Sequence, residues 1–136
     1  MTSLWPDDLV ATQDLNVPVH VLREQAAELT RLTDGKIVGF VSTYPVNETF
    51  VHSFSLQCPA LDDYSFKLFD VQHPLDAYPV SIIVPNERNL PGMPAYREIE
   101  CFDEKQFEAE LRTVLSSHRV KKVINSLLSQ VSDIGK

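Results

Sequence analysis

Alternating hydrophobic and polar residues mark the middle of the chain as a run of β-strands. The clearest alternation covers Thr49–Cys58, where phenylalanine, histidine, leucine and cysteine occupy every second position and mostly hydroxyl or amide side chains lie between them. A period of two predicts a half-buried antiparallel strand with one solvated face. Further strand-like runs predict four more strands, over residues 36–44, 64–71, 78–84 and 95–102.

Helical spacing of apolar residues predicts helices on both sides of this run. One stripe over residues 18–33 predicts the first helix, with Pro18 tolerated in its first turn. A second helix is predicted to begin after Asp103, which forms a capping-box pattern with Gln106 three residues later. A third helix is predicted over residues 119–132.

The order of these elements predicts the fold class. Short turns between the strands leave no room for crossover helices, so the strands should form a meander. We therefore expect an α+β fold with an N-terminal helix, a five-stranded antiparallel meander sheet and two C-terminal helices packed on one sheet face. A chain of 136 residues is predicted to be a single domain, residues 1–136. Residues 1–16 are expected to form an N-terminal arm docked by its apolar side chains, including the only tryptophan, Trp5.

The faces of the sheet are predicted from the same alternation. The residues of strand 49–58 that include His52 and Phe54 should lie beneath the helices. A lone histidine on such a face is more often a hydrogen-bonded core residue than a ligand. In the next strand, strict alternation places Phe69 and Val71 on the face opposite to Phe66.

Charge and composition narrow the classes of partner. The net charge is −7, and residues 1–118 carry 8 basic and 18 acidic residues. An acidic body disfavours non-specific binding to nucleic acid and is compatible with a basic protein partner. No apolar run approaches the roughly 20 residues needed to span a bilayer, and the start of the chain lacks the features of a signal peptide. We therefore expect a cytoplasmic protein with no membrane role, whose two cysteines, Cys58 and Cys101, are reduced thiols.

The sequence lacks the motifs of several common chemistries. Its four glycines make no phosphate-binding or dinucleotide-binding loop, and there is neither a CxxC nor an HExxH motif, so no cofactor is predicted. Asp70, His73 and Asp76 are close in sequence, but polar turns produce such clusters readily, and we predict no metal site. A catalytic triad that used Ser53 or Ser55 with His52 would need a nucleophile elbow and an oxyanion loop. The sequence has neither motif, so no catalytic residue is assigned.

These observations favour a non-enzymatic protein-binding domain of the immunity, antitoxin or secretion-accessory type. Its partner-binding candidates are the solvated side of the second strand and the acidic residues of the fifth, namely Thr49, Val51, Ser53, Ser55, Gln57, Glu98 and Glu100. A homodimer through the sheet or the last helix is an alternative form of association.

Two further interpretations remain open at this point. A small-ligand binder or enzyme would have its pocket between a curved sheet and the first helix, lined by Phe50, His52, Phe54, Tyr64, Phe66 and Tyr78. An anion-binding role would use the cations at the start of the last helix, Arg119, Lys121 and Lys122.

Overall fold

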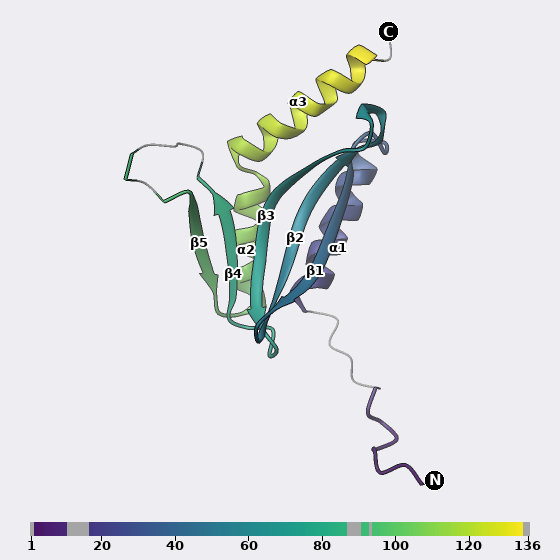
Figure 1. The fold of residues 1–136 in the computed structure, drawn as a ribbon, viewed down its shortest axis with the longest axis vertical. Coiled ribbons are helices and arrows are strands. Elements are labelled where there is room, and N and C mark those ends of the chain that lie inside the picture. The colour runs from purple at the N-terminus through teal and green to yellow at the C-terminus, as the bar shows by residue number, and fades with distance from the viewer. Residues whose placement is uncertain (1, 11–16, 87–90, 93, 135–136) are drawn as a thin grey trace.

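A computed structural model of the chain describes residues 2–10, 17–86, 91–92 and 94–134 (Figure 1). Its elements follow the predicted order of one helix, five strands and two helices, so the α+β fold class is confirmed. In chain order they are α1 (Pro18–Leu32), β1 (Val38–Val46), β2 (Thr49–Cys58), the 3-10 helix η1 (Pro59–Leu61), β3 (Tyr64–Pro74), β4 (Val80–Pro85), β5 (Tyr96–Cys101), α2 (Glu104–Leu115) and α3 (His118–Ile134).

The five strands form one antiparallel sheet in the order β1-β2-β3-β4-β5, the predicted meander. A two-residue turn joins β1 to β2, with Val46 paired to Thr49 and Asn47 at a φ of 56°. β5 is an edge strand, and its charged residues are typical of such a position. In Figure 1 the sheet lies in front of α1 and α2, while α3 extends above the top of the sheet.

All three helices contribute to one core on the inner face of the sheet. Its largest fully buried side chains include Leu22, Phe54, Leu56, Phe69 and Phe107. α1 covers β1 and β2, α2 covers β4 and β5, and α3 contacts η1. The opposite, outer face of the sheet carries none of these helices.

A close approach between Gly39 and Ala26 positions α1 on the sheet. A Cβ atom at Gly39 would lie 2.8 Å from both the Cα and the carbonyl oxygen of Ala26, so only glycine fits this contact without a shift. The Thr30 hydroxyl accepts a hydrogen bond of 3.1 Å from the Gly39 amide at the same contact. Helix and strand therefore meet backbone to backbone at this point.

A β-bulge in β3 corrects one prediction from the sequence. Phe54 pairs with Phe69 but the next residue, Ser55, pairs with Lys67, so Leu68 is an extra residue in β3. The extra residue reverses the alternation, and Leu68, Phe69 and Val71 are all buried in the core. The expectation that Phe69 and Val71 lie on the outer face was wrong because strict alternation does not allow for an inserted residue.

The capping box predicted for the second helix is present at the start of α2. The Asp103 carboxylate accepts a hydrogen bond of 2.8 Å from the Gln106 amide, and the Gln106 side-chain oxygen accepts one of 2.9 Å from the Phe102 amide. The first bond satisfies a donor that a helix start would otherwise leave unpaired, whereas the Gln106 side chain reaches the amide one residue before the N-cap. Phe102 itself is 65% exposed.

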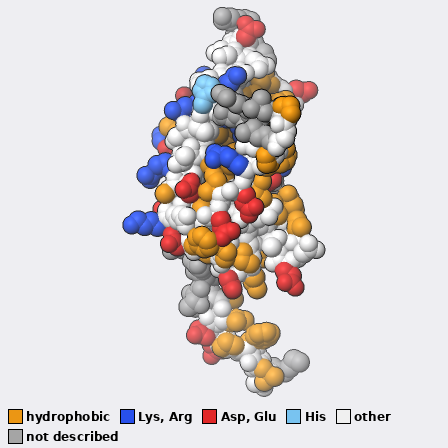
Figure 2. Space-filling model, turned by 90° about the vertical axis from the view of Figure 1, so that its left-hand side faces the viewer, with side chains coloured by type: hydrophobic (Ala, Val, Ile, Leu, Met, Phe, Trp, Pro, Cys, Tyr) orange, Lys and Arg blue, Asp and Glu red, His pale blue; other side chains and the backbone are white. Residues whose placement is uncertain are grey.

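The described part of the N-terminal arm, residues 2–10, extends away from the body (Figure 2). Leu4 and Trp5 are 97% and 72% exposed, so their apolar surface is not buried against the described part of the chain. The docking of the arm stays a prediction, and part of that predicted segment, residues 1 and 11–16, lies outside the described residues. Among the described helices, none has the length and apolar character needed to cross a bilayer.

Candidate functional site

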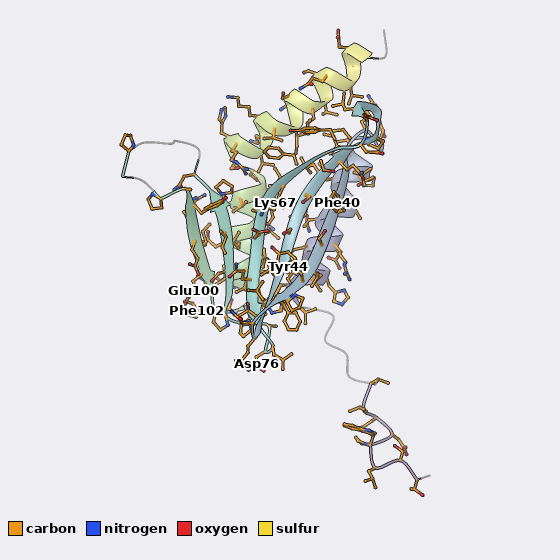
Figure 3. All side chains as sticks on the ribbon, in the orientation of Figure 1. Phe40, Tyr44, Lys67, Asp76, Glu100 and Phe102 are labelled. Carbon is orange, nitrogen blue, oxygen red and sulfur yellow. The ribbon has the colours of Figure 1, made fainter. Side chains whose placement is uncertain are left out.

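The outer face of the sheet, turned away from the helices, receives side chains from all five strands. Strand register assigns to it, among others, Phe40, Tyr44, Thr49, Val51, Ser53, Ser55, Gln57, Lys67, Asp70, Ile83, Tyr96, Glu98 and Glu100. We use the term outer face for this set. Figure 3 labels four of its members, which come from strands β1, β3 and β5.

The chemistry of the outer face changes from one edge of the sheet to the other. β1 contributes the uncharged side chains of Phe40 and Tyr44, and the Tyr44 ring is 43% exposed. β5 contributes Glu98 and Glu100 beside Tyr96, which is 56% exposed. Acidic side chains accordingly appear on the β5 side of the molecule in Figure 2. One edge is therefore aromatic, and the other combines an aromatic ring with negative charge.

An ion pair occupies the centre of the outer face. Lys67 Nζ lies 3.0 Å from Asp70 Oδ2, and the Ser53 hydroxyl donates a hydrogen bond of 2.6 Å to Asp70 Oδ1. The hydrogen bond to Asp70 raises the pKa of Lys67, and the nearby phenols of Tyr44 and Tyr96 add to this effect. The bulge makes the pair possible, because residues three apart in a regular strand point to opposite faces.

The structure places the partner-binding candidates on the predicted face but buries several of them. Val51, Ser53 and Ser55 are only 3%, 8% and 8% exposed, while Thr49 and Gln57 are half-buried. Larger residues flank these small ones on the adjacent strands; Ser55, for example, lies between Phe40 and Lys67. Glu98 and Glu100 are exposed. The accessible surface is therefore formed mainly by residues on the strands next to β2. Sequence reasoning missed these residues because the burial of a side chain within one face depends on strand order.

Two buried histidines face each other on the inner side of the sheet. His52 Nε2 lies 2.7 Å from His73 Nε2, and the rings stack with their centroids 4.8 Å apart. His52 Nδ1 is 2.8 Å from the Thr43 hydroxyl, and His73 Nδ1 is 2.6 Å from the Pro74 carbonyl oxygen. All four ring nitrogens thus have a partner.

The direction of these hydrogen bonds follows from the carbonyl, which only accepts. His73 Nδ1 therefore donates to Pro74, and in the neutral ring His73 Nε2 accepts from the Nε2–H of His52. His52 Nδ1 then accepts from the hydroxyl of Thr43. Burial is the main cause that lowers the pKa of His52 to about 4, with smaller electrostatic contributions from His73 and Arg23. The pair is a buried, hydrogen-bonded part of the core.

The polar residues considered for chemistry are separated by the sheet. Asp70 lies on the outer face, whereas His73 lies on the inner face, so these two do not converge on one ion. Within the described residues, no group of three or more potential ligands could hold a metal. Ser53 and His52 are likewise on opposite faces of β2, an arrangement that prevents the serine from using this histidine as a base.

The six residues expected to line one ligand pocket are divided among different environments. Phe54 forms part of a cavity of about 270 Å³ between α1 and α3, with Leu68 and Leu115. Tyr64 and Phe66 line a separate cavity of about 390 Å³ beside α3. His52 packs against His73, which in turn contacts Phe50 at 5.7 Å between ring centroids. Tyr78 is half-buried against the core.

The three anion-binding candidates also differ from one another. Arg119 Nη1 donates a hydrogen bond of 2.8 Å to the Leu68 carbonyl oxygen, and its guanidinium lies 5.8 Å from the Phe66 ring centroid. These contacts give Arg119 a structural role at the bulge. Lys121 and Lys122 are exposed, and Lys122 lines the cavity of about 390 Å³.

The two cysteines lie on β2 and β5, with β3 and β4 between them. Strands three positions apart are about 14 Å from each other, which is too far for a disulfide. Both thiols are fully buried. Burial raises the pKa of Cys58, and it raises the pKa of Cys101 to about 11, so neither is a ready nucleophile.

Comparison with known proteins gave no relative: no family model, no curated protein and no solved structure matches this chain.

Proposed function

We propose that this chain is a non-enzymatic cytoplasmic protein-binding domain of the immunity, antitoxin or secretion-accessory type, and that its outer face binds the partner. The observation that carries the proposal is the one-sided packing of the helices, which leaves exposed aromatic side chains on the opposite face of the sheet. Tyr44 on β1 and Tyr96 on β5 are 43% and 56% exposed. Tyrosine is among the residues that most often dominate binding energy at protein interfaces.

The distribution of charge on the outer face indicates the chemistry of the partner. Glu98 and Glu100 on β5 favour a basic partner, as does the net charge of −7. Phe40 and Tyr44 on β1 favour an apolar surface on the same partner. The partner we propose is therefore a protein that presents basic side chains toward β5 and apolar side chains toward β1.

The central ion pair is suited to a face that becomes buried. Removing an unpaired charge from water is costly, but Asp70 already has Lys67 and Ser53 as partners. A docking protein therefore need not supply a counter-charge at the centre of the outer face. We expect the partner to contact mainly the aromatic side chains and the glutamates of the outer face.

Site-specific photo-crosslinking in an extract of the native host tests this proposal. A benzoylphenylalanine at position 44 or 96 should crosslink to a distinct basic protein, and the same residue at Glu108 or Arg112, which are exposed on α2, should not. A competing excess of unmodified chain should abolish the product. Equal products from both faces, or products only from α2, would argue against the outer face, and a product containing only a second copy of this chain would indicate self-association instead.

A further inference from the structure

A groove beside α3 combines an apolar floor with positive charge. It is the cavity of about 390 Å³ that is lined by Tyr64, Phe66, Lys122, Val123, Ser126, Leu127 and Gln130. Cavities that take ligands usually measure roughly 300–1,000 Å³. We call it the α3 groove. It lies apart from the outer face, because Tyr64 and Phe66 are on the inner side of the sheet by strand register.

The charge of the α3 groove distinguishes it from three other cavities among the described residues. Its lining includes Lys122 and no carboxylate, whereas the three other cavities described each include an aspartate or glutamate. Lys121 is exposed next to Lys122, and the first turn of α3 contains no acidic residue. Because the start of a helix already carries partial positive charge, these lysines are poorly placed unless an anion approaches them.

The N-terminal arm has the complementary chemistry. Leu4, Trp5 and Val10 are 97%, 72% and 70% exposed, although such side chains are usually buried. Asp7 and Asp8 follow the tryptophan within three residues and are also exposed. The arm thus presents a large apolar ring followed by two carboxylates in a turn, in which the Leu9 amide donates a hydrogen bond of 3.2 Å to the Pro6 carbonyl oxygen.

We propose that the α3 groove binds the N-terminal arm of a second copy of this chain. Trp5 enters the apolar part of the groove against Tyr64 and Phe66, and Asp7 and Asp8 pair with Lys121 and Lys122. Two copies related by a two-fold axis exchange arms, so that each groove is filled by the partner's arm. The outer face takes no part in this contact and stays accessible to a different protein.

The position of the arm favours a second copy over the same chain. α1 begins toward one end of the molecule, and α3, which lines the groove, lies toward the other end (Figure 1). The 15 residues of α1 alone span about 22 Å. The residues between Trp5 and Pro18 would have to cover this length and then cross to α3, within a maximum reach of about 40 Å. An arm from a second copy avoids this loss of chain entropy.

Fluorescence of the full-length chain provides the test, since Trp5 is its only tryptophan. As concentration rises, the emission of Trp5 should shift to shorter wavelength and its quenching by acrylamide should fall, in parallel with dimer formation in sedimentation velocity. Removal of residues 2–10 should give a monomer at all concentrations.

A charge exchange between arm and groove separates this contact from general loss of folding. Asp7→Lys/Asp8→Lys and Lys121→Glu/Lys122→Glu should each be monomeric when alone, with circular dichroism like that of the wild type. Mixed in equal amounts, they should form a heterodimer, because each arm then meets a groove of opposite charge. Lys105→Glu, an exposed lysine on α2, is the matched control and should leave the dimer unchanged.

Three results would overturn the proposal. One is a wild-type monomer with quenchable Trp5 at every concentration, and another is a monomer with protected Trp5, which would place the arm on its own chain. The third is a dimer that survives removal of residues 2–10. Failure of photo-crosslinking from the outer face would leave each of these readouts unaffected, so the two proposals fail independently.

Discussion

Lys67 and Asp70 lie three residues apart in β3 and yet form an ion pair on one face of the sheet, with 3.0 Å between Nζ and Oδ2. The extra residue Leu68 makes this contact possible, and it also turns Phe69 into the core. The single inserted residue therefore determines which side chains of β3 lie on the outer face and which lie in the core.

Replacing Asp70 by asparagine should lower stability, because the change removes the partner of Lys67 and weakens the hydrogen bond from Ser53. The pair is partly exposed, with Lys67 at 50%, so the expected loss is about 1 kcal/mol. Urea denaturation measures it. Glu98→Gln, an exposed carboxylate on the same face, should change stability by less than about 0.5 kcal/mol. Equal effects of the two changes would contradict the structural role given to Asp70.

Replacing Gly39 by alanine should destabilise the contact between α1 and β1 by about 1–3 kcal/mol, since the new Cβ meets the Ala26 backbone at 2.8 Å. Thermal unfolding followed by circular dichroism measures this loss. The addition of Ala26→Gly should not restore stability, because the nearest atoms belong to the main chain. Rescue by Ala26→Gly would show that the methyl group, and not the backbone, limits the approach.

Stability should fall as the pH decreases from about 6.5 to about 4. The folded-state pKa of His52, about 4, lies below the value of about 6.5 expected in the unfolded chain. The unfolded state therefore binds more protons in this window, and folding loses free energy as pH falls. Chemical denaturation at several pH values should show a loss on the order of 1–3 kcal/mol from this group.

His52→Gln should reduce this pH dependence, because glutamine keeps a polar side chain without titrating. His118→Gln is the control, since His118 is exposed. An unchanged pH profile in His52→Gln would mean that other groups cause the acid sensitivity.

Arg119→Gln should lower stability by about 1–2 kcal/mol, because it removes the hydrogen bond to the Leu68 carbonyl at the bulge. Lys105→Gln, an exposed lysine on α2, should have little effect on the free energy of unfolding. Urea midpoints of the two variants provide the comparison. A larger loss of stability in the control variant than in Arg119→Gln would contradict the structural role given to the Arg119 hydrogen bond.

The sequence predicts the element order, the meander and the capping box because these depend on local patterns and short turns. The sequence does not predict the bulge at Leu68. Phe66, Leu68 and Phe69 are all apolar, so their pattern does not show where strict alternation is interrupted. The contact between His52 and His73 depends on the register of β2 against β3, which no local pattern specifies. These are the places where tertiary structure adds information.

The candidate site shows the same limit. Alternation along β2 identifies the outer face correctly, but it selects Val51, Ser53 and Ser55, which the structure buries. Their accessibility depends on the larger side chains of the adjacent strands, such as Phe40 and Lys67. Knowledge of the strand order is needed before a surface can be assigned residue by residue.

The central claim is that the outer face binds a basic protein, and the affinity of the crosslinked partner for paired variants tests it most directly. Tyr44→Ala/Glu98→Lys should weaken binding in isothermal titration calorimetry by at least about tenfold, since interface tyrosines and complementary charges contribute strongly. Arg112→Ala/Glu108→Lys on α2 should bind like the wild type. Unchanged affinity in the first variant, or an equal loss in the second, would contradict the claim.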